Sequence, residues 1–512
     1  MDVSTRKRNS VFSSIFGLLN NIIHIFFAFY LRKQFVNYFS AEYLGLYSFF
    51  DSIFGMLIAL DCGVSSSVFF QIYEPIAKND KEHVVSLFNL IRIIYSLRAI
   101  LVLIIGFVIS FYLPNLLIGT DIELSYIFKC YYIYMIFNST NYFFVFYSFY
   151  LEALQKRFVI SIIQIFMYFV EITAKLLAIF VFRSFILYLI FSVAFILLTN
   201  VICAFYVYGK EPYLLKKSKI NSEDKKNIKK LFGMALHSLS SAASRYTDTF
   251  LITSLSGLIN TGLFTNYKTI SSNVTTLLNQ ITSSIKDPFR NYIICEDKSK
   301  VESMLYNLNY LIFVLAGVCT SCIICLSNDF ITIWLGKEFL LSDLTVLFTT
   351  LTFLLSFMNY FIIDAYYITQ SYYRDKKSPI IELLVNLVIS FVLGIKYGIL
   401  GIMVGTVIYY FVQTILRLRR LYKCFFDKSC KFMLLRLAFF FSINLATSVI
   451  LNYISRIIFP KTTIVNFIFK AFFLIISSLI LTLLFTFRLK EFLYFKEVVN
   501  NMIIKILKRI KK

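Results

Sequence analysis

Charged side chains lie inside long apolar stretches of this chain. An ionised group at the centre of a membrane helix costs roughly 2.5–3.5 kcal/mol on insertion scales, so a charge kept there is a candidate for binding or ion transfer. Twelve such residues occur: Asp51, Asp61, Arg92, Arg98, Lys129, Glu171, Lys175, Arg245, Asp248, Lys268, Asp364 and Glu382. Their spacing and neighbours separate binding candidates from paired or peripheral charges.

Arg245 and Asp248 offer the clearest binding chemistry. They are three positions apart and share a helix face, within the small and polar sequence HSLSSAASRYTDT. That composition is typical of a face that lines a wet cavity. With Lys268 they would form a cationic interior, and guanidinium and ammonium groups both bind phosphate oxygens. We predict a substrate cavity lined by Arg245, Lys268, Asp248, Asp51 and Arg98.

A second set of charges could couple transport to an ion. Glu171 and Lys175 are four positions apart, so they can neutralise each other on one helix face. A structural pair is as good an interpretation as a functional one. The carboxylates of Asp51, Asp248 and Glu171, with Lys175 beside them, could instead serve a coupling proton or sodium ion. No other cofactor is predicted.

Three of the charges lie near the ends of their apolar stretches. From these positions the side chains of Asp61, Arg92 and Glu382 can reach the membrane surface while their stems stay in the apolar layer. We interpret them as snorkelling side chains rather than as site residues.

The sequence lacks the patterns of several other chemistries. Cys319, Cys322 and Cys325 form a C-x-x-C-x-x-C run, but it lies in an apolar helix and lacks the fourth ligand of an iron–sulfur cluster. All nine cysteines are expected to be free thiols, and the three histidines are too scattered for a metal site. There is no G-x-x-x-x-G-K-[ST] phosphate loop. We predict no metal site, and a transporter rather than an enzyme.

The elements that carry these residues must be membrane helices. Apolar residues make up 59% of the 512 residues and charged residues 15%, against about 45–50% and about 25% in soluble domains. Runs of roughly 20 apolar residues, the length that crosses a bilayer, recur along the chain. The predicted spans are 11–31, 44–68, 92–113, 124–149, 158–181, 185–208, 232–255, 258–284, 303–326, 342–364, 379–396, 398–416, 432–455 and 464–487. The chain is predicted to be an all-α integral membrane protein with about fourteen transmembrane helices.

The distribution of basic residues orients these helices. The loops and termini on one side of the predicted membrane hold 36 Lys and Arg residues, and those on the other side hold 7. The positive-inside rule therefore places both termini in the cytoplasm. The net charge of +23 then faces membrane lipid head groups rather than nucleic acid. Residues 488–512 alternate apolar and basic residues at helical spacing, which indicates a surface helix, with a solvated tail as the alternative.

Two segments of the chain repeat. GLYSFFDSI, which starts at Gly45, matches GLFTNYKTI, which starts at Gly262, with three identities. The same separation along the chain pairs Gly119 with Gly336, and it pairs Asp51 with Lys268. The two halves would thus present opposite charges from equivalent helices, either lining a cavity or forming a buried salt bridge between lobes.

The repeat divides the chain into two pseudo-symmetric six-helix lobes. Between such repeats, transporters commonly hold a substrate near the middle of the membrane. The predicted parts are an N-terminal lobe, 1–208; a cytoplasmic linker, 209–231; a C-terminal lobe, 232–425; two further helices, 426–487; and a basic cytoplasmic tail, 488–512.

Ordered motifs along the chain carry a family resemblance. The segments are RKRNSVFSSIFGLLN, EYLGLYSFFDSI, LDCGVSSSVFFQIYEPIAKND, TDTFLITSLSGLINTGLFTNY, FITIWLGKEFLL and SPIIELLVNLVISFVLGIKYGILGIMVGTVI. In their order and spacing they resemble bacterial polysaccharide biosynthesis proteins. Within that group they are similar to the capsule and O-antigen repeat-unit flippases of the multidrug, oligosaccharidyl-lipid and polysaccharide exporter superfamily.

This resemblance implies a V-shaped pair of lobes that transfers undecaprenyl-diphosphate-linked oligosaccharide across the bacterial cytoplasmic (inner) membrane by alternating access. It implies that cationic cavity residues engage the diphosphate or acidic sugars, and by motif match these are Arg245 and Lys268, with Asp248 beside them. A polysaccharide polymerase and a chain-length regulator are the implied protein partners.

Two other transport functions remain open at this stage. A cation-coupled drug antiporter of the same superfamily would use the carboxylates in the membrane, although the first span lacks the proline that bends this helix in many drug-exporting relatives. A lipid II flippase for cell-wall synthesis is the other alternative. A glycan polymerase would need a reactive outer loop, and the predicted outer loops are short and carry few charges.

Overall fold

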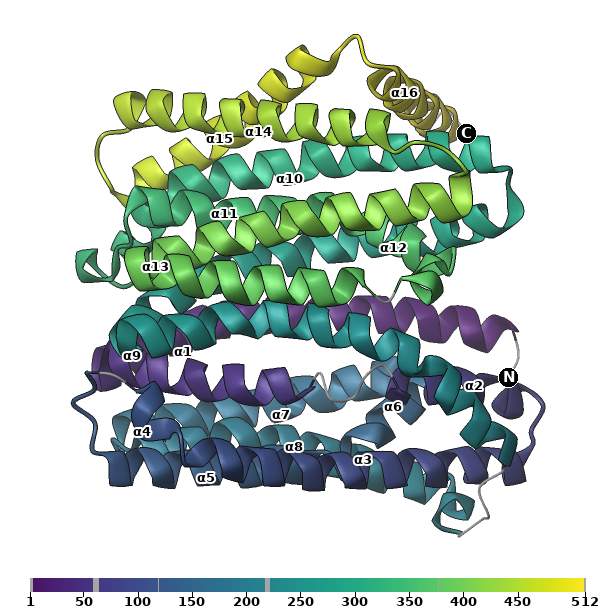
Figure 1. Cartoon of the computed structure of the whole chain (residues 1–512), viewed down its shortest axis with the longest axis vertical. Helices are drawn as coiled ribbons and strands as arrows, with labels where there is room; N and C mark the ends of the chain where they lie inside the picture. The colour runs from purple at the N-terminus through teal and green to yellow at the C-terminus, as the bar shows by residue number, and fades with distance from the viewer. Residues whose placement is uncertain (1–2, 59–63, 118, 217–221, 376, 511–512) are drawn as a thin grey trace. The chain divides into compact units, whose positions relative to one another are not determined.

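The chain forms helices along almost its whole described length. The computed structural model describes residues 3–58, 64–117, 119–216, 222–375 and 377–510, and this part of the chain contains no strand. In the first half the α-helices are α1 (Val3–Ile58), α2 (Val64–Ala77), α3 (Lys81–Ser110), α4 (Leu113–Leu116), α5 (Leu124–Asn141), α6 (Val145–Ala153), α7 (Arg157–Phe180), α8 (Phe185–Lys210) and α9 (Ser222–Cys295). Among these, α5 packs along both α3 and α8, and Figure 1 shows the axes of the three helices lying roughly parallel.

The second half continues in the same way. Its α-helices are α10 (Lys298–Trp334), α11 (Asp343–Met358), α12 (Tyr360–Ile368), α13 (Ser378–Leu421), α14 (Lys431–Ile458), α15 (Ile464–Thr486) and α16 (Lys490–Ile510). The sequence prediction of an all-α protein is confirmed, and the basic tail forms the helix α16. Eight helical stretches of the described residues are long and apolar enough to cross a membrane.

Three helices each hold two of the predicted spans because one residue interrupts the helical backbone. The breaks are at Ser40 in α1, Gly257 in α9 and Gly398 in α13, all with positive φ. After the break the two halves of α13 pack against each other, as Figure 1 shows. Counted in this way, the predicted spans fall on helices, and three of them, 44–68, 124–149 and 342–364, each run over two consecutive helices. Asp61 and Cys62 lie outside the described residues.

The backbone repeats between the two halves of the chain. Positive φ is uncommon in residues with a side chain and marks special turns. Four such positions of the first half recur in the second half at nearly constant separation: Ser40 with Gly257, Gly119 with Gly336, Gln155 with Gln370 and Arg183 with Gly398. The starts of α3 and α10 are separated in the same way. The duplication predicted from the segments at Gly45 and Gly262 is therefore present in the fold.

Internal contacts group the chain into two compact units. The first comprises Met1–Gly262 and the second Leu263–Lys512, so the break at Gly257 belongs to the first. The V-shaped arrangement and the domain boundaries at 208, 231 and 425 stay predictions.

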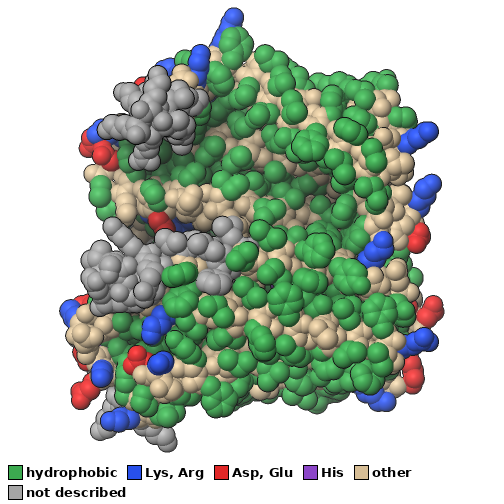
Figure 2. All heavy atoms as spheres, turned by 180° about the vertical axis from the view of Figure 1, so that it is seen from behind, with side chains coloured by type: hydrophobic (Ala, Val, Ile, Leu, Met, Phe, Trp, Pro, Cys, Tyr) green, Lys and Arg blue, Asp and Glu red, His purple; other side chains and the backbone are tan. Residues whose placement is uncertain are grey.

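The protein presents apolar side chains where a membrane protein faces lipid. Phe26, Phe205 and Phe472 are each more than 60% exposed, which would be costly in water over so many residues. Figure 2 shows hydrophobic side chains across most of one face, with Lys, Arg, Asp and Glu near two opposite edges. This distribution fits a multi-pass membrane protein whose helix ends reach the polar layers.

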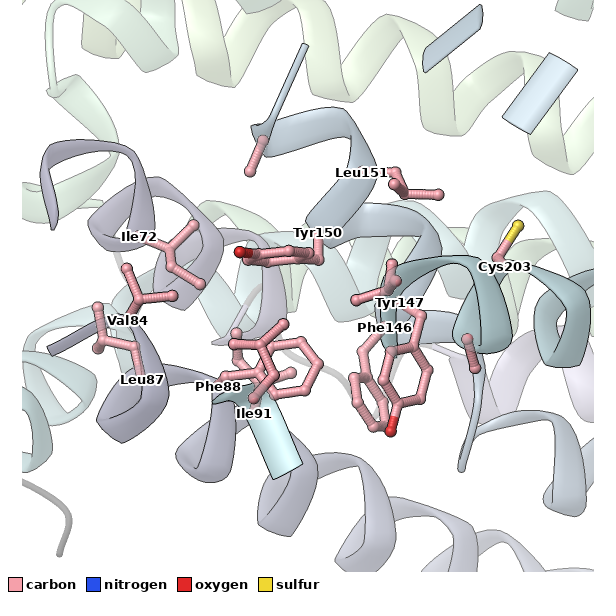
Figure 3. Close-up of a cluster of buried hydrophobic side chains, with 14 of the residues drawn as sticks. Ile72, Val84, Leu87, Phe88, Ile91, Phe146, Tyr147, Tyr150, Leu151 and Cys203 are labelled. Carbon is pink, nitrogen blue, oxygen red and sulfur yellow. The ribbon is translucent and has the colours of Figure 1, made fainter. Parts of the chain in front are cut away.

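An aromatic core holds one end of the first unit together. Phe88 of α3 packs at 5.4 Å between ring centroids against Phe146 and Tyr150 of α6, as Figure 3 shows. Arg92 does not snorkel freely: its Nη2 donates to the Tyr208 hydroxyl and to the Leu214 carbonyl, both at 3.3 Å. The sequence interpretation of Arg92 was incomplete, because its partners follow much later in the chain. They fasten the start of the linker to α3.

A polar seam joins the two halves of α13. Buried residues recur every fourth position in both halves: Ser378, Glu382, Asn386, Ser390 and Gly394 before the break, and Gly401, Gly405, Tyr409, Gln413 and Arg417 after it. A Cβ at Gly401 would collide with the Leu393 carbonyl, and one at Gly405 with Ser390. Small residues at helix interfaces in membranes permit this close approach.

We expect Gly401→Val to destabilise the protein, because the added side chain must displace the backbone of Leu393. Overpacking costs about 1–3 kcal/mol in a well-packed interior. Gly209→Val is the control, since a Cβ at Gly209 meets nothing within 4 Å. Thermal unfolding in detergent measures both variants. Equal Tm values for the two would contradict the close packing of α13.

Candidate functional site

The first unit holds most of the predicted site residues. Asp51 lies in the second half of α1, Arg98 in α3, Glu171 and Lys175 in α7, and Arg245 and Asp248 in α9. Lys268 also lies in α9 but belongs to the second unit. The proposed relation between Asp51 and Lys268 across the repeat therefore stays a prediction.

Glu171 and Lys175 form the ion pair that their spacing predicts. Lys175 Nζ lies 2.5 Å from Glu171 Oε1, and only 10% and 15% of the Lys175 and Glu171 side chains are exposed. Lys175 Nζ also lies 5.2 Å from the centre of the Tyr188 ring on α8, within the range of a cation–π interaction. The pair thus lies on α7 and contacts a second helix, α8, through the Tyr188 ring.

Tyrosines connect this ion pair to Asp51. The Tyr134 hydroxyl donates to Asp51 Oδ1 at 3.3 Å. The Tyr47 ring packs edge to face on Tyr134 at 6.0 Å and on Tyr188 at 6.3 Å. We call Tyr47, Tyr134 and Tyr188 the tyrosine bridge, because these residues link the carboxylate on α1 to the cation on α7. The tyrosine bridge supplies hydroxyl groups that can bind sugar or phosphate oxygens.

The first half of α1 closes this region from another side. His24 stacks on Tyr168 of α7 with 4.6 Å between ring centroids, and the Tyr168 hydroxyl donates to the His24 carbonyl at 3.1 Å. Asn20 Nδ2 donates to Gln164 Oε1 at 3.2 Å, one turn earlier on α7. These contacts fix α1 on the helix that carries Glu171.

The N-terminal part of α9 lies along the second half of α1 within the first unit. Phe250 stacks on Phe49 at 5.8 Å between ring centroids, and Gly55 leaves space for the Tyr246 ring. Arg245 precedes Tyr246 in α9, and Asp51 lies one turn before Gly55 in α1, so the two charges lie on helix segments that pack against each other. That they line one cavity stays a prediction. Arg245 is exposed and Asp248 is almost buried.

Arg98 is held by aromatic rings. Its guanidinium lies 4.4 Å from the centre of the Tyr142 ring and 5.8 Å from that of Tyr95. The residue is 7% exposed. A guanidinium over aromatic faces makes cation–π interactions and can still act on an anion nearby. The place of Arg98 in the predicted cavity stays a prediction.

The second unit contains a charged cluster whose partners the sequence analysis missed. Asp364 is 3% exposed and receives Arg290 Nη2 at 2.8 Å and Lys286 Nζ at 3.3 Å. Lys286 also lies 4.9 Å from the centre of the Tyr360 ring. Asp364 lies within the predicted span 342–364, but Lys286 and Arg290 lie beyond the predicted span 258–284, where the sequence predicts a loop. In the structure both belong to α9. Only the fold brings positions so distant in the sequence together.

The interpretation of Glu382 as a snorkelling side chain is wrong. Glu382 is fully buried, and Arg417 donates to both of its oxygens, from Nε at 3.1 Å and from Nη2 at 2.8 Å. Gln413 Nε2 adds a bond at 3.2 Å. Arg417 lies in the other half of α13, so this bidentate pair joins the two halves at one end of the polar seam. Because both side chains are buried, either charge would be strongly destabilising without the other.

The described residues contain no group of three or more His, Cys, Asp or Glu side chains that could hold a metal ion. Cys319, Cys322 and Cys325 are free thiols on α10, as are the other described cysteines. The first unit instead offers cations, carboxylates and tyrosine hydroxyls inside a bundle of membrane helices. Such a set can bind an anionic or sugar-bearing molecule and can exchange a proton at a carboxylate.

A family model described as "Polysaccharide biosynthesis protein" matches residues 7–285. Among solved structures, the inward closed form of lipid II flippase MurJ matches with a TM-score of 0.66 and 16% identity, covering 93% of this chain and 99% of that one. An inward-facing multidrug resistance MATE family transporter of the MOP superfamily matches with a TM-score of 0.54, 13% identity, and coverage of 81% and 100%.

A third similar structure is the MATE transporter VcmN of Vibrio cholerae, with a TM-score of 0.56, 13% identity, and coverage of 84% and 99%. No curated protein sequence gives a significant match. At these identities the structural likeness establishes the fold alone.

The ion pair on α7 can be tested by removing one charge or both. Glu171→Gln leaves Lys175 buried without its carboxylate, which costs about 3–5 kcal/mol for an interior pair, so we expect a lower yield of folded protein. Glu171→Gln with Lys175→Met removes both charges and should restore the yield but not transport. Membrane protein level and export, measured in the same cells, separate the two effects. Wild-type export by the double variant would show that the ion pair contributes to folding and not to transport.

Proposed function

Because the chain belongs to the polysaccharide biosynthesis protein family, we propose that it is a flippase for undecaprenyl-diphosphate-linked oligosaccharide repeat units. The product would serve O-antigen, capsule or another surface polysaccharide. The observation that carries this proposal is the group of cations and tyrosines inside the first unit. A diphosphate needs positive charge, and sugar hydroxyls need hydrogen-bond partners such as the tyrosine bridge.

In this proposal Arg245, Lys268 and Arg98 bind the diphosphate or acidic sugars, with Asp248 and Asp51 as hydrogen-bond acceptors. The sugar headgroup lies in a polar cavity while the polyprenyl tail stays in lipid. Alternating access then exposes the cavity first to the cytoplasm and afterwards to the outer leaflet. No covalent step is involved, so the protein acts as a transporter and not as an enzyme.

Carboxylates in the first unit are the proposed sites of ion coupling. Asp51 is exposed and bound by the Tyr134 hydroxyl, whereas Glu171 is paired with Lys175. Protonation of Glu171 would remove the charge that pairs with Lys175, and protonation of Asp51 would remove a negative charge beside Tyr134. A proton or sodium ion could therefore change the charge that the substrate meets. Asp248, which is almost buried, is the third candidate.

The proposed location is the bacterial cytoplasmic membrane, with both termini in the cytoplasm, as the distribution of Lys and Arg predicts. A polysaccharide polymerase and a chain-length regulator would then receive the product on the outer side. Membrane lipids surround the apolar faces.

A lipid II flippase is the second candidate function. The similarity to lipid II flippase MurJ extends over nearly the whole of both chains, whereas the MATE transporters leave a larger part of this chain unmatched. This difference favours a lipid-linked substrate over the drug antiporter alternative. Lipid II also carries a diphosphate, so both candidate substrates fit the same cations.

Purified protein in proteoliposomes distinguishes these functions. Undecaprenyl-diphosphate oligosaccharide with a fluorescent sugar is placed in both leaflets, and the label that remains accessible to an external quencher is followed over time. We expect transfer of the oligosaccharide substrate and slower or no transfer of lipid II. Transfer of lipid II alone would support the second candidate, and transfer of neither would contradict a flippase function.

We expect Arg245→Ala and Lys268→Ala each to reduce export by about 10- to 100-fold, because a charge-assisted hydrogen bond contributes about 1.5–3 kcal/mol. Lys129→Ala is the matched control, since Lys129 is an exposed cation within the predicted span at 124–149. Surface polysaccharide is measured at equal membrane protein levels. Full complementation by both cavity variants would remove the support for this cavity.

A further inference from the structure

A cation of the second unit lies where three helices meet. Arg436, near the start of α14, lines a cavity of about 440 Å³ together with Tyr306 of α10 and Phe432, Leu435 and Phe439 of α14. It is the one charged residue among those that line this cavity. Phe432 and Leu435 are 80% and 67% exposed, so the cavity opens toward lipid.

Neighbouring cavities extend this space in two directions. A cavity of about 620 Å³ shares Tyr306 and Phe432 with it, and its other lining residues are Ser299, Glu302, Ser303, Lys428 and Ser429. A cavity of about 310 Å³ shares Leu435 and is lined mainly by apolar residues. Arg436 therefore stands between a polar space and an apolar slot, at the end of α14 that the positive-inside rule places at the cytoplasmic surface.

The carboxylate of Glu491, in the C-terminal tail, forms an ion pair with Arg436. Arg436 Nη2 lies 3.0 Å from Glu491 Oε1 and 3.3 Å from Oε2, and the Glu491 side chain is only 5% exposed. Glu491 lies in the first turn of α16, which also packs the ring of Phe495 at 6.0 Å from that of Tyr310. Two carboxylate oxygens offer a guanidinium the same geometry as two phosphate oxygens. The site thus already contains an internal anion.

We propose that Arg436 is the phosphate anchor of a binding site for an anionic membrane phospholipid, and that Glu491 holds this site when the lipid is absent. The headgroup would lie beside Tyr306 and the serines, where Lys428 is paired with Glu302 at 2.6 Å and Arg436 supplies the cation. An acyl chain would follow Phe432 and Leu435 into the apolar slot. The proposal goes beyond the transport function and does not depend on which substrate is moved.

The chemistry of the lining selects this occupant. A free phosphate would satisfy Arg436 but leave the apolar slot unfilled, whereas a neutral lipid would fill the slot without pairing the cation. A phospholipid with a net negative charge does both. The tail supports this choice, because α16 carries Lys496, Lys505 and Lys508 and is drawn to an anionic leaflet. A lipid that replaces Glu491 would release the first turn of α16 from Arg436.

Native mass spectrometry of the purified full-length protein, with phosphatidylglycerol or phosphatidylethanolamine added, tests the site. We expect wild-type protein to retain phosphatidylglycerol preferentially, and Arg436→Gln to lower this retention by about tenfold or more, as expected for losing a charge-assisted bond. Glu491→Gln should raise retention, because the competing carboxylate is gone. Arg456→Gln is the control, since Arg456 pairs with Asp343 near the other end of α14 and should leave retention unchanged.

Each contrary result has a distinct meaning. Unchanged phosphatidylglycerol retention in Arg436→Gln would overturn the site. Reduced or unchanged retention in Glu491→Gln would show that the ion pair only fastens α16, and this variant decides alone if Arg436→Gln fails to fold. Displacement of the lipid by glycerol 3-phosphate would indicate a free-phosphate site. Stronger, Arg436-dependent binding of undecaprenyl phosphate would assign the site to the carrier lipid and overturn the choice of phospholipid.

Discussion

The structure depends on one constraint: a charge inside the membrane must find its partner within the protein. Glu171 with Lys175, Glu382 with Arg417, and Asp329 with Lys470 at 2.8 Å all satisfy it. Except for the pair on α7, these contacts join different helices or helix halves. Because an unpaired charge would be far more costly in lipid than in water, the two pairs that join different helices or helix halves also select which segments pack together.

The duplicated backbone carries different chemistry in its two copies. When the chain is aligned on the pair Gln155 and Gln370, Glu171 and Lys175 correspond to Asn386 and Ser390. The first copy thus places an ion pair against the tyrosine bridge, while the second places small polar residues in the seam of α13. The same break points therefore hold an ion pair in one unit and close helix packing in the other.

The last three helices add a lipid-facing region to the duplicated part. Ser321 of α10 bonds Ser448 of α14 at 2.9 Å and Ser478 of α15 at 3.2 Å, so α14 and α15 pack on α10 through polar contacts. The start of α16 then closes over Arg436.

By itself the sequence determined the class of the protein, its fourteen spans, the repeat and the pairing of Glu171 with Lys175. These follow from local properties: apolar length, helical spacing and the match between the segments at Gly45 and Gly262. Only the tertiary structure decided that Arg417 neutralises Glu382 and that Tyr47 links Asp51 to the ion pair on α7. Partners far apart in the sequence meet through helix packing, and spacing along the chain does not encode such contacts.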